Sequence, residues 1–340
     1  MLRLPPFRFV QPGRLEEATA RLADEGSAAR VVAGGTDLWP NMKRRHQTAS
    51  TVISLLRIPG LEGIQANGEL TIGATTRLDD VVRSEAVRRR YPALARAVAS
   101  ISSPPLRNMG TLGGNLCLDT RCTYYNQTEE WRRSIDYCLK EEGTVCWVAP
   151  GSSICWAHSA SDSAPVLAAL DARVRLAGVE GEREIAVDEL FRNDGIDYLT
   201  KRPEEILTEI RLPPGSAADR CRSSFWKLRR RGSIDFAVLS VAVAVWTHPD
   251  GTVERARIYL GSVASRPVAA EEASRLLVGT RPGEETVAAA ARAARKVATP
   301  MDNTDFQTQW RGVMAERYAE AALREALGLE RRRALPAHPM

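Results

Sequence analysis

Gly110-Thr111-Leu112-Gly113-Gly114-Asn115 is the stretch that decides how this 340-residue chain folds. Glycines lack a Cβ atom and permit positive φ, so successive backbone N–H groups in such a turn can point into one concavity. A second glycine turn, Ala33-Gly34-Gly35-Thr36-Asp37-Leu38, comes earlier in the chain. Neither turn has the G-x-G-x-x-G spacing of a Rossmann fingerprint. Two such turns in one domain nevertheless indicate dinucleotide binding, because a diphosphate and its sugars need close backbone approach.

The segments around both turns predict two small α/β units. Apolar residues at helical spacing, followed by Gly26, predict a helix at 15–25. A strand that ends in a glycine turn is the usual setting of a phosphate-binding loop. We expect strands at 7–10, 29–33, 51–55 and 70–74, and helices at 15–25, 78–87 and 92–100.

The region after Asn115 is rich in cysteine. It contains five of the six cysteines of the chain, namely Cys117, Cys122, Cys138, Cys146 and Cys155. In a reducing cytosol, such a cluster consists of metal ligands more often than of disulfides, and free buried thiols fit poorly with a polar, aromatic loop. The last four are separated by fifteen, seven and eight residues. These gaps exceed the C-x2-C steps of ferredoxins and zinc knuckles, so spacing alone leaves zinc and iron–sulfur both open.

The composition is that of a soluble globular protein, with 44% hydrophobic and 26% charged residues. No apolar run approaches the roughly 18 residues that span a bilayer, and the N-terminus has no apolar signal region. We therefore expect a cytoplasmic protein without membrane association. The net charge is +5, but the arginine runs lack interleaved aromatic residues or a helix-turn-helix signal, so nucleic acid is not an expected partner.

The second half of the chain predicts a linker followed by an α+β unit. Pro213-Pro214-Gly215 is the clearest linker signal, and we place a domain boundary there. Before it we expect a short helix at 166–170 and strands at 173–177, 184–187 and 205–212. After it we expect antiparallel strands at 224–229, 237–247 and 254–262, helices at 270–277, 284–297 and 307–326, and a frayed end at 330–340.

Six segments, in order and spacing from about Phe7 to Leu327, resemble the flavin-binding medium subunit of the xanthine oxidase and carbon monoxide dehydrogenase family of molybdenum hydroxylases. They are 33–38, Thr75-Thr76, 110–115, Ser161-Asp162, Glu205-Ile206-Leu207 and Phe225-Trp226-Lys227-Leu228-Arg229-Arg230. The resemblance implies an α+β fold with a two-part FAD-binding domain of the vanillyl-alcohol-oxidase-like (PCMH) type. The implied bounds are 1–215 for that domain (subdomains of about 1–55 and 56–215, with an insertion at about 117–158), 220–328 for a C-terminal domain and 329–340 for a tail.

The same resemblance implies which residues hold FAD. The two glycine turns would cradle the pyrophosphate, Asp162 would accept a hydrogen bond from ribityl or ribose hydroxyls, and Leu207 would pack near the flavin or adenine. Lys227 would approach the isoalloxazine, where a cation favours reduced, anionic flavin. From the residues alone, Asp162 also fits a helix N-cap and Lys227 a solvated strand lysine. The implied FAD residues are Ala33, Gly34, Gly35, Thr36, Asp37, Leu38, Thr75, Thr76, Gly110, Thr111, Gly113, Gly114, Asn115, Asp162, Leu207 and Lys227.

Most members of that family lack the segment from Cys117 to His158. The flavin subunits of 4-hydroxybenzoyl-CoA reductases are the branch known for an extra loop at this place, in which four cysteines hold a [4Fe–4S] cluster. The similarity implies that this chain has the same ligand set, with Cys117 as a spare and Cys221 as a structural thiol. The implied cluster ligands are Cys122, Cys138, Cys146 and Cys155.

The resemblance also implies electron transfer. Electrons would pass from ferredoxin through [4Fe–4S] and FAD to [2Fe–2S] clusters in a small subunit and molybdopterin in a large one, within a dimer of heterotrimers that forms benzoyl-CoA by reductive dehydroxylation. We expect no catalytic residue for substrate chemistry in this chain, because its four histidines are dispersed without a triad pattern. Two alternatives stay open: the flavin subunit of another aromatic, purine or carbon monoxide hydroxylase, and a zinc-stapled binding module without a redox role.

Overall fold

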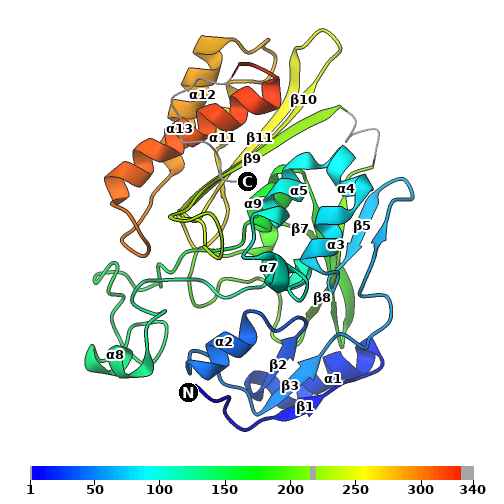
Figure 1. Cartoon of the computed structure of the whole chain (residues 1–340), viewed down its shortest axis with the longest axis vertical. Helices are drawn as coiled ribbons and strands as arrows, with labels where there is room; N and C mark the ends of the chain where they lie inside the picture. The colour runs from blue at the N-terminus through cyan, green and yellow to red at the C-terminus, as the bar shows by residue number, and fades with distance from the viewer. Residues whose placement is uncertain (1, 215–219, 331–340) are drawn as a thin grey trace.

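A computed structural model describes residues 2–214 and 220–330, and over these residues the chain forms three β-sheets (Figure 1). The first sheet is parallel, with the order β1 (Arg8–Val10), β3 (Thr51–Ser54), β2 (Ala29–Val32). Helix α1 (Leu15–Glu25) and a 3-10 turn (Gly26–Ala28) connect β1 to β2. Ala18 and Leu22 of α1 share a small apolar core with Ile53 of β3. The helix and strands predicted here are confirmed.

The second sheet is antiparallel and has the order β4 (Ile64–Gln65), β5 (Leu70–Gly73), β8 (Ile206–Leu212), β6 (Arg173–Gly178), β7 (Gly181–Ala186). One large apolar core joins it to α3 (Leu78–Arg83), α4 (Glu85–Arg90), α5 (Pro92–Ala99) and α9 (Ser163–Ala169). The single helix predicted at 78–87 was wrong. Ser84 between α3 and α4 has a non-helical conformation, and its hydroxyl accepts a hydrogen bond from the N–H of Val87, so it caps a new helix.

The third sheet is antiparallel, with the order β12 (Val268–Ala269), β11 (Val253–Gly261), β10 (Leu239–Thr247), β9 (Cys221–Leu228). One face packs on α11 (Glu271–Arg275), α12 (Glu284–Val297) and α13 (Thr308–Leu327). The other face packs on α5 and α9. Because β10 is covered on both faces, its sequence is apolar at nearly every position, and the strand predicted at 237–247 is confirmed.

Several short elements between these layers were not predicted. They are α2 (Leu38–Lys43), α6 (Pro104–Arg107), α7 (Leu112–Leu116), α8 (Glu129–Ser134) and a 3-10 turn at Asp188–Leu190. Residues 116–158 leave the body after α7 as an extended loop that carries α8 at its outer end, on the same side as α2 (Figure 1).

Two expectations fall mainly outside the part of the chain that the structure describes. The linker prediction extends from Pro213 into residues 215–219, and the frayed end covers 331–340. Among the described residues, no helix is long and apolar enough to cross a membrane.

Candidate functional site

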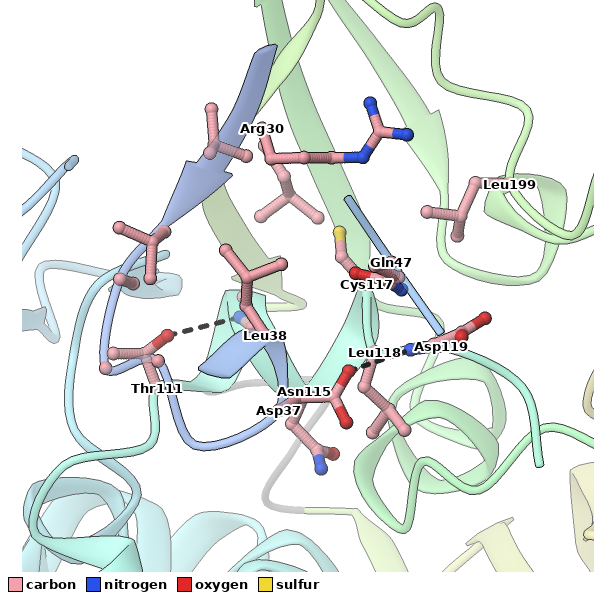
Figure 2. A pocket seen from close by; sticks show the side chains of 18 of the residues that line it. Arg30, Asp37, Leu38, Gln47, Thr111, Asn115, Cys117, Leu118, Asp119 and Leu199 are labelled. Atoms are coloured by element: carbon pink, nitrogen blue, oxygen red, sulfur yellow. Dashed lines mark hydrogen bonds between the residues drawn. The ribbon is translucent and has the colours of Figure 1, made fainter. Parts of the chain in front are cut away.

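A cleft of about 1080 Å³ lies where the first sheet, α7 and the second sheet meet (Figure 2). Both glycine turns line it, so the structure brings together two segments that are more than seventy residues apart in the sequence. Its volume is at the upper end of the range for cofactor pockets. Of the predicted FAD residues, all but Thr76, Asp162 and Lys227 line this cleft. From the C-terminal half, Ile234 and Phe236 also reach it.

At Gly34 and Gly113 the neighbouring residues pack so closely that a side chain has no room. A Cβ added to Gly34 would lie 1.7 Å from the backbone oxygen of Met109, which is next to Gly110. A Cβ added to Gly113 would lie 2.7 Å from the Cβ of Ala74, and the N–H of Gly113 already donates to the Ala74 oxygen at 2.9 Å. These glycines therefore join the turns to each other and to β5, which shapes the cleft before any ligand binds.

Thr111 caps the N-terminus of α7, and Asn115 holds the helix to Ser161 and Ser163. The Thr111 hydroxyl accepts a hydrogen bond from the N–H of Gly114 at 3.2 Å and caps the helix. Asn115 Oδ1 accepts from the hydroxyls of Ser161 and Ser163, at 3.0 and 2.6 Å. The amide NH2 is the remaining donor group of Asn115, a side chain that lines the cleft.

Asp37 anchors the first turn to the beginning of the cysteine-rich segment. Its carboxylate pairs with Arg121 and accepts from the N–H of Asp119 at 3.2 Å, the contact drawn in Figure 2. Burial raises the pKa of Asp37, while the charge of Arg121 acts in the opposite direction. Arg121 also stacks over Phe236, with 4.8 Å between the guanidinium carbon and the ring centroid.

Asp162 and Lys227 form a buried ion pair between the two halves of the chain. Lys227 Nζ donates to Asp162 Oδ2 at 2.6 Å and to the Ser100 oxygen at 3.1 Å. Both side chains are almost fully buried, so Lys227 is not a solvated strand lysine, and the Asp162 side chain makes no N-cap hydrogen bond. Burial raises the pKa of Asp162, opposed by Lys227. Among the described residues, Asp162 Oδ1 is a buried acceptor without a partner.

Thr76 has a structural place. Its hydroxyl bonds the N–H and the carbonyl of Gly63, at 2.9 and 3.0 Å, and so holds the loop before β4. Its neighbour Thr75 lines the cleft. Of the predicted pair, Thr75 therefore belongs to the cleft, whereas Thr76 stabilises the loop before β4.

The four predicted cluster ligands line one small, separate cavity, together with Tyr124, Tyr125, Trp147 and others. Burial raises the pKa of the Cys122 thiol to about 12 and that of Cys155 to about 11. Backbone N–H groups act in the opposite direction, and that of Ala157 lies 3.4 Å from Cys155 Sγ. All four cysteines are buried free thiols, whereas Cys117 lines the large cleft and Cys221 lies at the start of β9.

The cavity does not hold a metal-site geometry. Over residues 2–214 and 220–330, no three or more His, Cys, Asp or Glu side chains come together in a way that could hold a metal ion. The four thiols line one cavity without forming a metal site, and the shape of the loop that carries them depends on other contacts.

Those other contacts come from charged residues that sequence reasoning missed. The guanidinium of Arg132, 1% exposed, donates to Glu141, Glu129 and the backbone oxygens of Gln127 and Arg44. The signal in the sequence was weak, because Arg132 is followed by the exposed Arg133 and the pair looks like a solvated run. Asn303, between α12 and α13, ties the segment to the C-terminal half by donating to the Trp156 oxygen at 2.6 Å and accepting from the N–H of Thr123.

Neither histidine near the cysteines has the properties of an acid–base catalyst at neutral pH. Burial lowers the pKa of His158 to about 4, and its ring nitrogen lies 3.1 Å from the Ser159 oxygen. Burial and the charge of Arg132 lower the pKa of His46 to about 4. Both rings are therefore neutral near pH 7.

Fold and cleft together define an α+β protein with a cofactor-sized cleft that is lined by two glycine turns. Residues 5–215 match the family described as FAD binding domain in molybdopterin dehydrogenase, and residues 223–326 match the CO dehydrogenase flavoprotein C-terminal domain. The chain belongs to the family of FAD-binding medium subunits of the molybdenum hydroxylases.

Two relatives and a solved structure match nearly the whole length of this chain. It is 31% identical over 324 residues to the carbon monoxide dehydrogenase medium chain of Hydrogenophaga pseudoflava, with 94% of this chain and 97% of that one covered. It is 28% identical over 330 residues to the 6-hydroxypseudooxynicotine dehydrogenase complex subunit alpha of Paenarthrobacter nicotinovorans, with 96% of each covered. A solved structure of the Hydrogenophaga pseudoflava carbon monoxide dehydrogenase superposes with a TM-score of 0.78 at 29% identity, over 96% of this chain and 99% of that one. The predicted two-domain α+β fold is confirmed.

Proposed function

We propose that this chain is an electron-transfer subunit that binds FAD in the large cleft and an iron–sulfur cluster in the cysteine-rich segment. The observation that carries the second half of this proposal is the convergence of Cys122, Cys138, Cys146 and Cys155 on one buried cavity. Four thiolates are a donor set for a [4Fe–4S] cluster or for zinc. We favour the cluster because the loop adjoins a flavin site, where a one-electron carrier has a use.

The size of the cleft and the polar groups that line it support FAD as the ligand. The turns at 33–38 and 110–115 would hold the pyrophosphate, and Asn115 would offer its amide NH2. Asp162 and Lys227 do not line the cleft, and their ion pair would support it from behind, since the neighbouring Ser161 and Ser163 hold Asn115. Leu207 gives the apolar wall. Bound flavin would supply the step between one-electron and two-electron carriers.

The remaining chemistry belongs to partner subunits in this proposal. Relatives carry the names medium chain and complex subunit, and one is an aldehyde oxidoreductase FAD-binding subunit of Escherichia coli. We propose a molybdopterin-binding large subunit and a small subunit with two [2Fe–2S] clusters as partners, in a cytoplasmic dimer of heterotrimers. The extra cluster favours a 4-hydroxybenzoyl-CoA reductase type of complex, with ferredoxin as the donor.

A second candidate rests on the same relatives. These relatives belong to a carbon monoxide dehydrogenase and a 6-hydroxypseudooxynicotine dehydrogenase, which are oxidative activities. They favour a hydroxylase or dehydrogenase complex in which electrons leave the molybdenum subunit through FAD. Reduction of the purified complex by ferredoxin plus 4-hydroxybenzoyl-CoA turnover supports the first candidate, and reduction by an aldehyde, carbon monoxide or an N-heterocycle supports the second.

Anaerobic purification with cofactor analysis tests the proposal for the chain itself. We expect one FAD and about four iron and four acid-labile sulfide per chain, since a cubane holds four of each. Stoichiometric zinc without sulfide would replace the cluster by a structural zinc site. Protein without flavin, even after incubation with FAD, would contradict the cleft assignment.

A further inference from the structure

Lys140 lies between the large cleft and the cysteine cavity, and it is neither part of a glycine turn nor one of the proposed metal ligands. Its side chain is 6% exposed. Nζ donates to Asp119 Oδ1 at 2.6 Å, to Thr120 Oγ1 at 2.5 Å and to the Gly195 oxygen at 2.6 Å. An ammonium group has three N–H donors, so this buried cation is fully coordinated by the protein.

The hydrogen-bond partners of Lys140 connect it to both sites. Asp119 lines the large cleft, while Lys140 itself lines the cysteine cavity. Gly195 touches a predicted ligand, because its N–H donates to the Cys155 oxygen at 2.8 Å and a Cβ added to it would lie 2.8 Å from Cys155 Sγ. Residues 196–199, directly after Gly195, line the large cleft.

Of the two aromatic rings beside Lys140, one belongs to each site. Nζ lies 4.9 Å from the ring centroid of Tyr125, which lines the cysteine cavity, and 5.4 Å from that of Tyr198, which lines the cleft. A cation in a site with little water interacts favourably with such rings. Hydrogen bonds fix both rings as well, since the Tyr125 hydroxyl donates to the His46 oxygen and the Tyr198 hydroxyl to the Cys117 oxygen.

The charge of Lys140 acts in both directions from this place. On one side, Lys140 lines the cysteine cavity and bonds the oxygen of Gly195, whose N–H donates to the Cys155 oxygen. On the other side, its cation neutralises Asp119, whose N–H bonds Asp37 of the first glycine turn. Because buried charges interact over longer distances than exposed ones, a change at Lys140 reaches both cavities.

We infer that Lys140, paired with Asp119, is a positioning residue that joins the FAD cleft to the cysteine cavity and sets the reduction potential of the bound flavin. The inference rests on the proposed FAD function and does not need the cluster. Replacing Lys140 removes a buried cation and leaves Asp119 uncompensated, so reduction of a nearby flavin, which adds negative charge, becomes harder.

The test compares K140M with D119N in the full-length chain, with R133M as the matched control. R133M removes one positive charge from the same segment, but from a side chain that is 69% exposed. We expect K140M to raise the dissociation constant of FAD about tenfold, as couplings between sites typically do. The midpoint potential of bound FAD should shift to more negative values in K140M and to more positive values in D119N, and R133M should change neither quantity.

The opposite signs separate an electrostatic role from a purely structural one. A structural defect moves both variants in the same direction, and that result overturns the inference, as does a K140M protein whose FAD affinity and potential match the wild type. K140R should recover part of the wild-type potential. If K140M does not fold, K140Q takes its place in the comparison with D119N, because it removes the charge but keeps a polar side chain. Cofactor analysis of the wild type tests the cluster separately, because FAD affinity and flavin potential are compared among variants that keep all four cysteines.

Discussion

The large cleft proposed to hold FAD and the cysteine-rich segment are built in different ways. The cleft lies between sheets, and its walls are fixed by backbone contacts such as the approach of Gly34 to Met109. The segment from 116 to 158 has one short helix, α8, among its described residues, and side-chain contacts of Arg132 and Lys140 give it its shape. The first site is a property of the fold, and the second depends on a few buried charges. Changes in the two regions should therefore have different consequences.

The largest expected effect is the loss of metal from cysteine variants. C138S or C146S should lower the iron and sulfide content of anaerobically purified protein to a small fraction of the wild-type value, because a cubane lacking one thiolate is poorly held. FAD content should stay near one per chain, since neither cysteine lines the cleft.

Cys117 and Cys221 supply the matched controls, because they are thiols outside the cysteine cavity. C117S and C221S should keep the full iron content. Equal iron loss in C117S and C146S would mean that the ligand set has been assigned wrongly. Loss of FAD in C138S would mean that the cysteine cavity itself supports the cleft.

Arg132 provides the next largest effect, on the segment alone. R132M removes a buried guanidinium from its pairs with Glu129 and Glu141 and leaves those carboxylates without their partner. Breaking one side of a buried ion pair costs about 3–5 kcal/mol. We expect proteolysis to cut within 116–158 in R132M while FAD binding persists, and R133M to stay as resistant as the wild type. Global unfolding of R132M without selective cleavage would contradict the separation of the two regions.

The helices and strands could largely be predicted from the sequence, but the structure of the cysteine-rich segment could not. The helices at 15–25 and 284–297 have the predicted bounds because helical periodicity encodes both locally, and Gly26 ends the first. The cleft residues could be found because paired glycines are a local signal. Arg132, Lys140 and Asn303 could not be found, since an arginine or lysine becomes buried only through partners that are distant in the chain. The break at Ser84 was missed because the apolar pattern continues across it.

Gly34 tests the cleft in the way that Arg132 tests the segment. G34A places a methyl group against the Met109 backbone oxygen, so one turn has to move away from the other. Overpacking of this kind costs about 1–3 kcal/mol, and the displaced turn should weaken FAD binding, measured by flavin fluorescence. Gly13 is the control, because a Cβ there meets nothing within 4 Å. G34A protein that binds FAD normally would show that the turns do not form the pyrophosphate site.

The smallest effect near neutral pH is expected for the pH dependence of stability. It concerns His158, whose backbone bonds that of Arg121, at the junction of the cysteine-rich segment and the cleft. His158 is 2% exposed and its pKa is lowered by burial to about 4, against an ordinary value of 6.5. Because the folded state holds the neutral ring, the unfolded chain binds a proton first as pH falls. The stabilisation is complete above about pH 6.5 and is lost between there and pH 4, by about 3 kcal/mol at the lower limit. His46 acts in the same direction. Urea unfolding at pH 7.5 and 4.5 should show this loss in the wild type and a smaller loss in H158N, whose side chain does not titrate. An equal loss in both proteins would mean that His158 takes up its proton in the folded state, and so that the junction admits water.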